Sequence, residues 1–131
     1  MTASSRWTGR RERKVLGREG EELACNYLRS RGFEIIGTNF RRRGGEIDII
    51  ARSLDLIVFV EVKTRIGSES QAAYGLVQQR RLVDVAERFL AENAGALPAD
   101  YDVRFDFILA GKGEDGRLEI REHVQDAFRP D

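Results

Sequence analysis

The sequence has a single cysteine, Cys25, among its 131 residues, which excludes an internal disulfide and a zinc site built from several cysteines. No apolar run approaches the roughly 20 residues that a membrane-spanning helix requires. The first residues, MTASSRW, lead into basic residues rather than an apolar segment, so no secretory signal is expected. The only histidine, His123, is expected to be structural, because no Ser/His/Asp relay can be assembled around it. These absences favour a protein of the reducing cytoplasm without a membrane partner.

Net charge is also absent, since 22 Lys and Arg balance 22 Asp and Glu. The balance conceals two segments of opposite sign: residues 1–43 carry a net +6 and residues 44–131 a net −6. Such asymmetry favours one surface suited to an anionic polymer, although a neutral chain is not expected to coat nucleic acid without selectivity. The length and the 41% hydrophobic content are typical of one globular domain.

Apolar spacing along the chain predicts a mixed α/β domain over residues 15–131, preceded by a flexible basic arm over residues 1–14. Helices are predicted over 15–31 and 76–93, and strands over 33–36, 46–52, 56–63, 101–109 and 117–122. This order implies a mixed sheet with a helix on each face. The strand over 101–109 alternates strictly, which predicts a half-buried strand with Asp106 on its solvent side, within reach of Arg104.

Two acids and a lysine lie in the hairpin predicted over 46–63. Strand geometry puts Glu61 and Lys63 on one face, and a turn centred on Leu54 places Asp48 opposite Val60 or, with a one-residue difference, opposite Glu61. Two adjacent carboxylates repel each other unless one is protonated or a cation lies between them. A hard divalent ion such as Mg²⁺ meets that need and would activate water for attack on a phosphate. Ordinary cross-strand ion pairs on a solvated face explain the same residues equally well from spacing alone.

The chain resembles the YraN family (UPF0102), bacterial proteins related to the PD-(D/E)XK nucleases and to the archaeal Holliday junction resolvases. The resemblance covers nearly the whole chain after about Val15. Its motifs are GxxGExxAxxYL at 17–28, NF at 39–40, GEIDII at 45–50, VFVEVKTR at 58–65, RFD at 104–106 and AF at 127–128. The GEIDII and FVEVKTR segments, about a hairpin apart, are highly specific to that family.

The resemblance implies a restriction-endonuclease-like αβββαβ core and metal-dependent hydrolysis of DNA, with branched DNA as a candidate substrate and a homodimer as a candidate assembly. It implies that Asp48 and Glu61 are the two acids of the nuclease motif and Lys63 its lysine. Glu21 matches the additional acid of resolvase-like members. The resemblance also adds the main-chain carbonyl of Val62 as a ligand, with Mg²⁺ or Mn²⁺ as the ion. Ile47 stands where the motif usually has proline.

Arginines flank the predicted site in the sequence. Arg41, Arg42 and Arg43 precede it, and Arg65 follows Lys63. Contact with DNA phosphates is one interpretation, because arginine forms bidentate hydrogen bonds to phosphate oxygens. A solvated run of charge is the other. Two further functions stay open for the chain: a non-catalytic nucleic-acid-binding accessory protein, and a protein-interaction domain that uses the apolar residues 127–128.

Overall fold

The computed structural model describes residues 3–65 and 76–130, with side chains for residues 14–65 and 79–130. The predicted order of one helix, three strands, a second helix and two strands is confirmed. The elements are α1 (Ala3–Ser30), β1 (Glu34–Arg42), β2 (Gly45–Ser53), β3 (Leu56–Arg65), α2 (Leu76–Glu92), the 3₁₀ turn η1 (Ala94–Ala96), β4 (Asp102–Lys112) and β5 (Leu118–Phe128).

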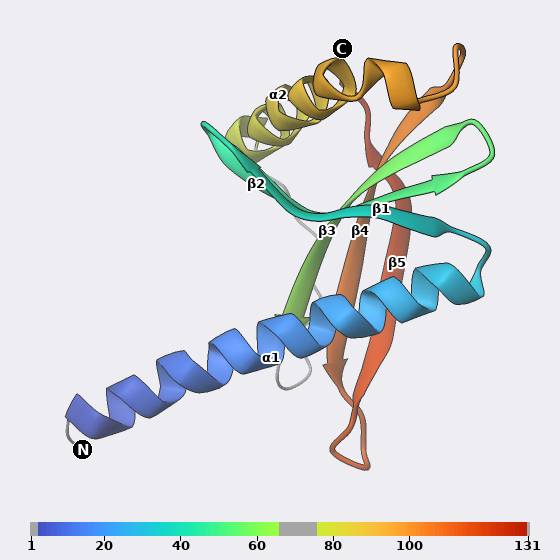
Figure 1. Cartoon of the computed structure of the whole chain (residues 1–131). Helices are drawn as coiled ribbons and strands as arrows, with labels where there is room; N and C mark the ends of the chain where they lie inside the picture. Colours follow the sequence, from blue (N-terminus) through green and yellow to red (C-terminus); the bar gives the residue numbers. More distant parts are fainter. Residues whose placement is uncertain (1–2, 66–75, 131) are drawn as a thin grey trace.

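The strands form one five-stranded sheet in sequence order, β1-β2-β3-β4-β5. Only β3 and β4 are parallel, and α2 lies in the connection between them, while the other neighbours pair antiparallel. Helix α1 crosses one face of the sheet and α2 covers the other (Figure 1). This arrangement is the restriction-endonuclease-like core that the resemblance implies.

Each helix packs on one face of the sheet and forms a separate apolar core there. On one face, Ala24, Cys25 and Leu28 of α1 pack on residues of β2, β3 and β4. On the other, α2 packs an apolar stripe that includes Val85 and Phe89 against the same strands. Because both faces are covered, β4 is buried along most of its length and Asp106 is only 3% exposed. The prediction of a half-buried strand with Asp106 facing solvent is therefore wrong, whereas its pairing with Arg104 is confirmed.

Helix α1 begins at Ala3 rather than at Val15. Apolar periodicity locates only the part of a helix that packs on a core, and the Arg, Lys, Glu and Ala residues before it favour helix without such packing. The first half of α1 extends past the edge of the sheet (Figure 1). The flexibility predicted for residues 1–14 stays a prediction. At the other end, Gly32 ends the helix, with φ +91° and a hydrogen bond from Phe33 N–H to the Leu28 carbonyl.

The pairing of β2 with β3 stops halfway along the two strands. It runs from the turn, where Ser53 faces Leu56, up to Ile49 and Val60. Beyond that point β2 continues beside β1 only, and β3 continues beside β4 only, out to Arg65. The two halves of the sheet diverge there (Figure 1). Beyond this point the backbone N–H and C=O groups of β2 and β3 no longer pair with each other.

Candidate metal-binding site

The residues predicted to form the site meet at this divergence. The register in which Ile49 faces Val60 places Asp48, one residue further, across from Glu61. Of the two registers that the sequence left open, the structure has the second. On the other side of β2, the register with β1 places Asn39 beside Asp48. The neighbours of Asn39 in β1 pair with the neighbours of Asp48 in β2, as Thr38 with Ile49 and Phe40 with Ile47. Asn39, Asp48 and Glu61 thus form a row across three strands.

Asp48 replaces the missing backbone contact between β2 and β3. Its Oδ2 accepts a hydrogen bond from the N–H of Val62 at 2.8 Å. Burial, followed by the Glu61 carboxylate beside it, raises the pKa of Asp48 to about 8, against the smaller lowering effect of the Val62 N–H. None of the groups that shift the pKa of Asp48 is a cation. The fold therefore gives this carboxyl group no cationic partner.

Lys63 places a positive charge near Glu61. Its Nζ lies 3.8 Å from Glu61 Oε2, and the side chains are 40% and 12% exposed respectively. At that distance the contact is an ion pair beyond hydrogen-bond length. This contact lies within β3, so it is not one of the cross-strand ion pairs that the sequence allowed, and it does not compensate Asp48.

Glu21 reaches the site from α1. Its Oε1 accepts a hydrogen bond from Asn39 Nδ2 at 3.0 Å. Burial, with the nearby charges of Asp48 and Glu46, raises the pKa of Glu21 against the lowering effect of that hydrogen bond. The helix comes this close because its preceding residue is a glycine. A Cβ at Gly20 would collide with the hydroxyl oxygen of Thr64 on β3. The absence of a side chain at Gly20 therefore allows the close approach of α1 to β3.

The donor set suits a hard divalent cation. Asp48 and Glu61 are oxygen ligands held together in a place largely withdrawn from water, where their mutual repulsion opposes full ionisation. Within the described residues, no three His, Cys, Asp or Glu side chains are grouped closely enough to hold a metal ion by themselves. A cation here would complete its shell with main-chain oxygen, water or substrate. Mg²⁺ commonly binds proteins through one or two carboxylates in this way.

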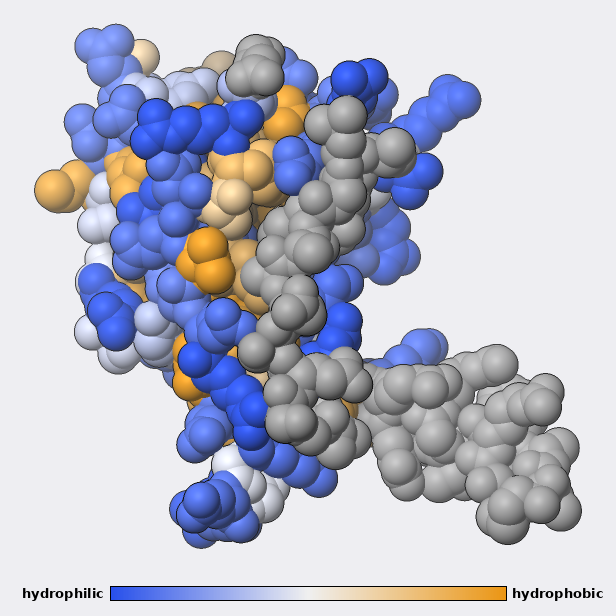
Figure 2. Space-filling model, turned by 180° about the vertical axis from the view of Figure 1, so that it is seen from behind, coloured by the Kyte–Doolittle hydropathy of each residue, from blue (hydrophilic) through white to orange (hydrophobic). Residues whose placement is uncertain are grey.

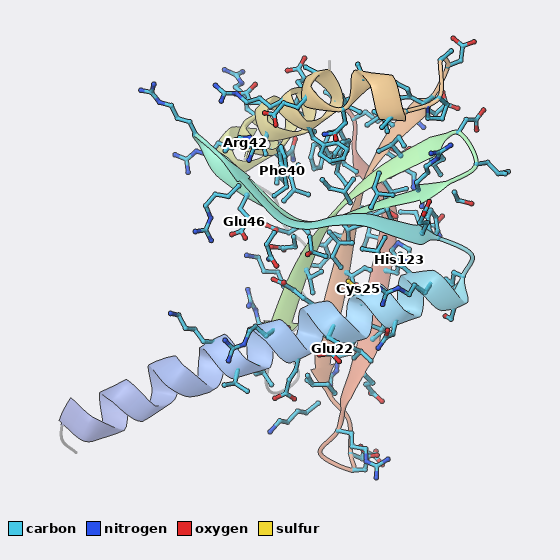
Figure 3. The ribbon with its side chains drawn as sticks, viewed as in Figure 1. Glu22, Cys25, Phe40, Arg42, Glu46 and His123 are labelled. Carbon is cyan, nitrogen blue, oxygen red and sulfur yellow. The ribbon has the colours of Figure 1, made fainter. Side chains whose placement is uncertain are left out.

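The predicted arginines differ in what they contact. Arg42 forms two hydrogen bonds to Glu92 of α2, at 2.9 and 2.6 Å, and its guanidinium lies 4.0 Å from the Phe40 ring centre. Arg41 contacts Glu46 at 3.1 Å and is 77% exposed. Figure 3 shows Arg42 and Phe40 near α2, and Glu46 on the side of the hairpin that faces α1. Arg43 lies exposed in the turn after β1, and Arg65 is exposed at the end of β3.

A second polar cluster, which the sequence did not predict as a unit, lies between α1, β4 and β5. Asp106 accepts two hydrogen bonds from Arg104 at 2.8 Å and contacts His123 Nε2 at 2.8 Å. His123 Nδ1 in turn contacts the Tyr27 hydroxyl at 2.9 Å. These contacts lower the pKa of Asp106 despite the opposing effect of burial. The only sequence signals were an acid inside a strongly apolar strand and the lone histidine, and a structural role for His123 agrees with this cluster.

Comparison with known proteins gives consistent family matches. A model for "Uncharacterised protein family UPF0102" matches residues 20–110. A UPF0102 protein of Chloroflexus aurantiacus is 42% identical over 86% of this chain and 91% of its own length, and one of Rhodococcus opacus is 42% identical over 87% and 96%. Among solved structures, Pyrococcus furiosus SfsA in complex with Ca²⁺ matches with a TM-score of 0.37 and 16% identity, covering 92% of this chain and 64% of SfsA.

Proposed function

The chain belongs to the UPF0102 family, and we propose that it is a Mg²⁺- or Mn²⁺-dependent DNA endonuclease. The single observation that carries the proposal is the Asp48–Glu61 pair at the divergence of β2 and β3, where the protein holds two carboxylates side by side and leaves Asp48 without a cation. Keeping such a pair costs folding free energy, which a bound divalent ion would offset. The nuclease fold supports the assignment by analogy.

Asp48 and Glu61 would hold the ion. Val62 donates its N–H towards β2, and because the N–H and carbonyl of a residue lie on the same edge of an extended strand, its carbonyl is a suitable third ligand. A bound Mg²⁺ or Mn²⁺ supplies an activated water and neutralises charge that develops on the phosphate. Lys63, on the same strand as Glu61, would orient the attacking water or stabilise that developing charge.

Arginines near the site would contact DNA phosphates. Arg41, Arg42, Arg43 and Arg65 are the proposed contacts, and Arg41 and Arg42 would exchange Glu46 and Glu92 for phosphate oxygens. Hydrophilic side chains cover most of the described surface in Figure 2, with apolar ones in small separate patches. Phe128, which the protein-interaction alternative invoked, is partly buried and stacks on the core residue Phe105, with ring centres 4.8 Å apart. No helix among the described residues is long and apolar enough to span a membrane. A two-fold dimer would suit the two strands of a symmetric DNA junction.

The test is cleavage of labelled linear, single-stranded, flap and four-way-junction DNA with Mn²⁺, Mg²⁺ or EDTA. Wild type is compared with Asp48→Asn and Lys63→Ala. We expect metal-dependent cutting that both substitutions abolish, and the preferred substrate will define the DNA structure recognised. Binding without cutting, unchanged by either substitution, would overturn the nuclease assignment in favour of a nucleic-acid-binding accessory protein.

A further inference from the structure

A chain of polar contacts connects the β1–β2 hairpin to α1 beside the carboxylate pair. Asn39 Nδ2 donates to Glu21 Oε1 at 3.0 Å and to Glu46 Oε2 at 3.2 Å, and Arg41 contacts the other oxygen of Glu46 at 3.1 Å. Both partners of Asn39 are carboxylates, which only accept when ionised, so the amide nitrogen is the atom that must face them. Asn39 is therefore the junction between two acids from two different elements.

The backbone at Asn39 is adapted to this task. Its φ of +50° lies in the left-handed region, which asparagine and glycine adopt more readily than other residues. Thr38 and Phe40 on either side keep the β1–β2 register, so the departure is confined to one residue. The register also places Asn39 directly beside Asp48. A conformation that is uncommon for a side-chain-bearing residue thus occurs where the strand meets the acids.

An amide suits this position better than a cation would. Four acidic side chains lie close together where β2 and β3 diverge, and their negative charges repel one another. They belong to Glu21, Glu46, Asp48 and Glu61. A lysine or arginine at position 39 would neutralise that charge and compete with a divalent ion. The neutral amide fixes Glu21 through hydrogen bonds and leaves the negative charge of the region intact.

We propose that Asn39 is a positioning residue that holds the Glu21 carboxylate of α1 towards the Asp48–Glu61 pair, where Glu21 would act through the waters of a divalent ion bound by that pair. The inference rests on the proposed function, because it assigns Asn39 a task at that same metal site. Asn39 contacts neither substrate nor the ion itself. It acts through Glu21, and its contact with Glu46 serves to orient the amide.

Mn²⁺ affinity of the full-length chain, measured by titration calorimetry, tests the proposal. Asn39→Gly removes the amide but tolerates the left-handed backbone. We expect it to weaken Mn²⁺ binding about tenfold, as the loss of residues that orient metal ligands commonly does. Leu54→Gly is the matched control, because Leu54 also has a positive φ of 57°, is 87% exposed and lies in the β2–β3 turn. It should leave Mn²⁺ affinity unchanged.

A double-mutant comparison separates positioning from general support of the fold. If Asn39 acts through Glu21, Asn39→Gly should change Mn²⁺ affinity less than about twofold when Glu21→Ala is already present, yet keep its about tenfold effect beside Glu46→Gln. An equal loss in all three backgrounds, or none in wild type, would overturn the inference and leave the metal site standing. Wild-type protein that binds no Mn²⁺, or binds it as well after Asp48→Asn, would overturn the proposed metal site and this inference with it.

Discussion

Asp48 and Asp106 are two aspartates withdrawn from water in one sheet, and their surroundings have opposite effects on them. Asp106 receives two hydrogen bonds from Arg104, one contact from His123 and the N–H of Asp126 at 3.0 Å. Asp48 receives one backbone N–H and stands beside Glu61. Burial raises the pKa of both carboxyl groups, but only Asp106 has partners that overcome it.

We interpret the difference as that between a structural acid, Asp106, and a proposed metal ligand, Asp48. At Asp106 the protein supplies every compensating charge, so nothing further is required for the folded state. At Asp48 it supplies almost none, and the deficit matches what a divalent cation would provide. A buried carboxylate is thus informative about function only when its partners have been counted.

The largest expected effect is at Asp48. Asp48→Asn should lower metal-dependent DNA cleavage by about a thousandfold or more, because it removes a ligand charge at the reacting phosphate. The same change should raise thermal stability in EDTA at pH 8, since it removes a carboxyl group that folding disfavours in its charged form. Cleavage rates and thermal unfolding in EDTA check the two parts. A variant less stable than wild type at pH 8 would contradict the comparison.

Removing a partner of Asp106 should cost stability instead. Arg104→Met leaves a buried carboxylate with reduced compensation, and we expect a loss of about 3 kcal/mol in the free energy of unfolding. Denaturant unfolding at neutral pH measures it, with Arg129→Met as a control, because the Arg129–Asp126 pair is exposed at the arginine. Equal small losses in both variants would show that the Asp106 cluster is no stronger than a surface pair.

Opposite pH dependences should distinguish the two aspartates. The raised pKa of Asp48 means that its contribution to stability is present below its ordinary pKa of 3.8 and is lost as pH rises towards about 8. The lowered pKa of Asp106 means that its contribution is present above 3.8 and is lost as pH falls through the lower folded-state value. Unfolding free energies in EDTA from pH 3 to 9 should show that Asp48→Asn removes the loss towards pH 8. Asp106→Asn should remove only a loss at the acidic end.

A smaller effect is expected where α1 approaches β3. Gly20→Ala should cost about 1–3 kcal/mol, because the added methyl group meets the Thr64 side chain and displaces the turn that carries Glu21. Chemical denaturation measures the loss. Adding Thr64→Ala to Gly20→Ala should recover most of it, and a double variant no better than Gly20→Ala alone would show that the contact is not the cause.

The smallest effect concerns the outer end of the Asp106 cluster. Tyr27→Phe removes one hydrogen bond to His123 and keeps the ring, which stands edge-on to the imidazole with ring centres 5.4 Å apart. We expect a loss of about 1 kcal/mol in unfolding free energy and no change in DNA cleavage. A large loss of cleavage would mean that this cluster belongs to the active site.

Apolar spacing predicted most of the helices and strands, because each of these elements carries its own apolar pattern in the sequence. The paired strands 46–52 and 56–63 and the helix over 76–93 needed only apolar spacing. The early start of α1 lacked such a signal, since a helix that projects from its core needs no apolar stripe. The burial of β4 depends on two helices that cover it from both faces, which no pattern within β4 records.

The candidate site shows the same difference between features of local sequence and contacts of distant segments. The proximity of Asp48, Glu61 and Lys63 could be predicted because they lie on two adjacent strands, although the final register required the structure. Glu21 came only from the family resemblance, since three glutamates lie close together on one helix and spacing does not choose among them. The role of Asn39 and the joining of Tyr27 to Asp106 through His123 could not be predicted, because they depend on contacts between distant segments.

Proton release on Mn²⁺ binding at pH 7 tests the central claim most directly. With the pKa of Asp48 at about 8, a bound ion must displace the proton that the carboxyl group carries. Calorimetric titrations in two buffers of different ionisation enthalpy should show that wild type releases close to one proton per Mn²⁺, and that Asp48→Asn binds weakly without release. Binding of Mn²⁺ to wild type with no proton released, or with equal affinity in Asp48→Asn, would contradict the claim that the fold leaves this carboxylate for a cation.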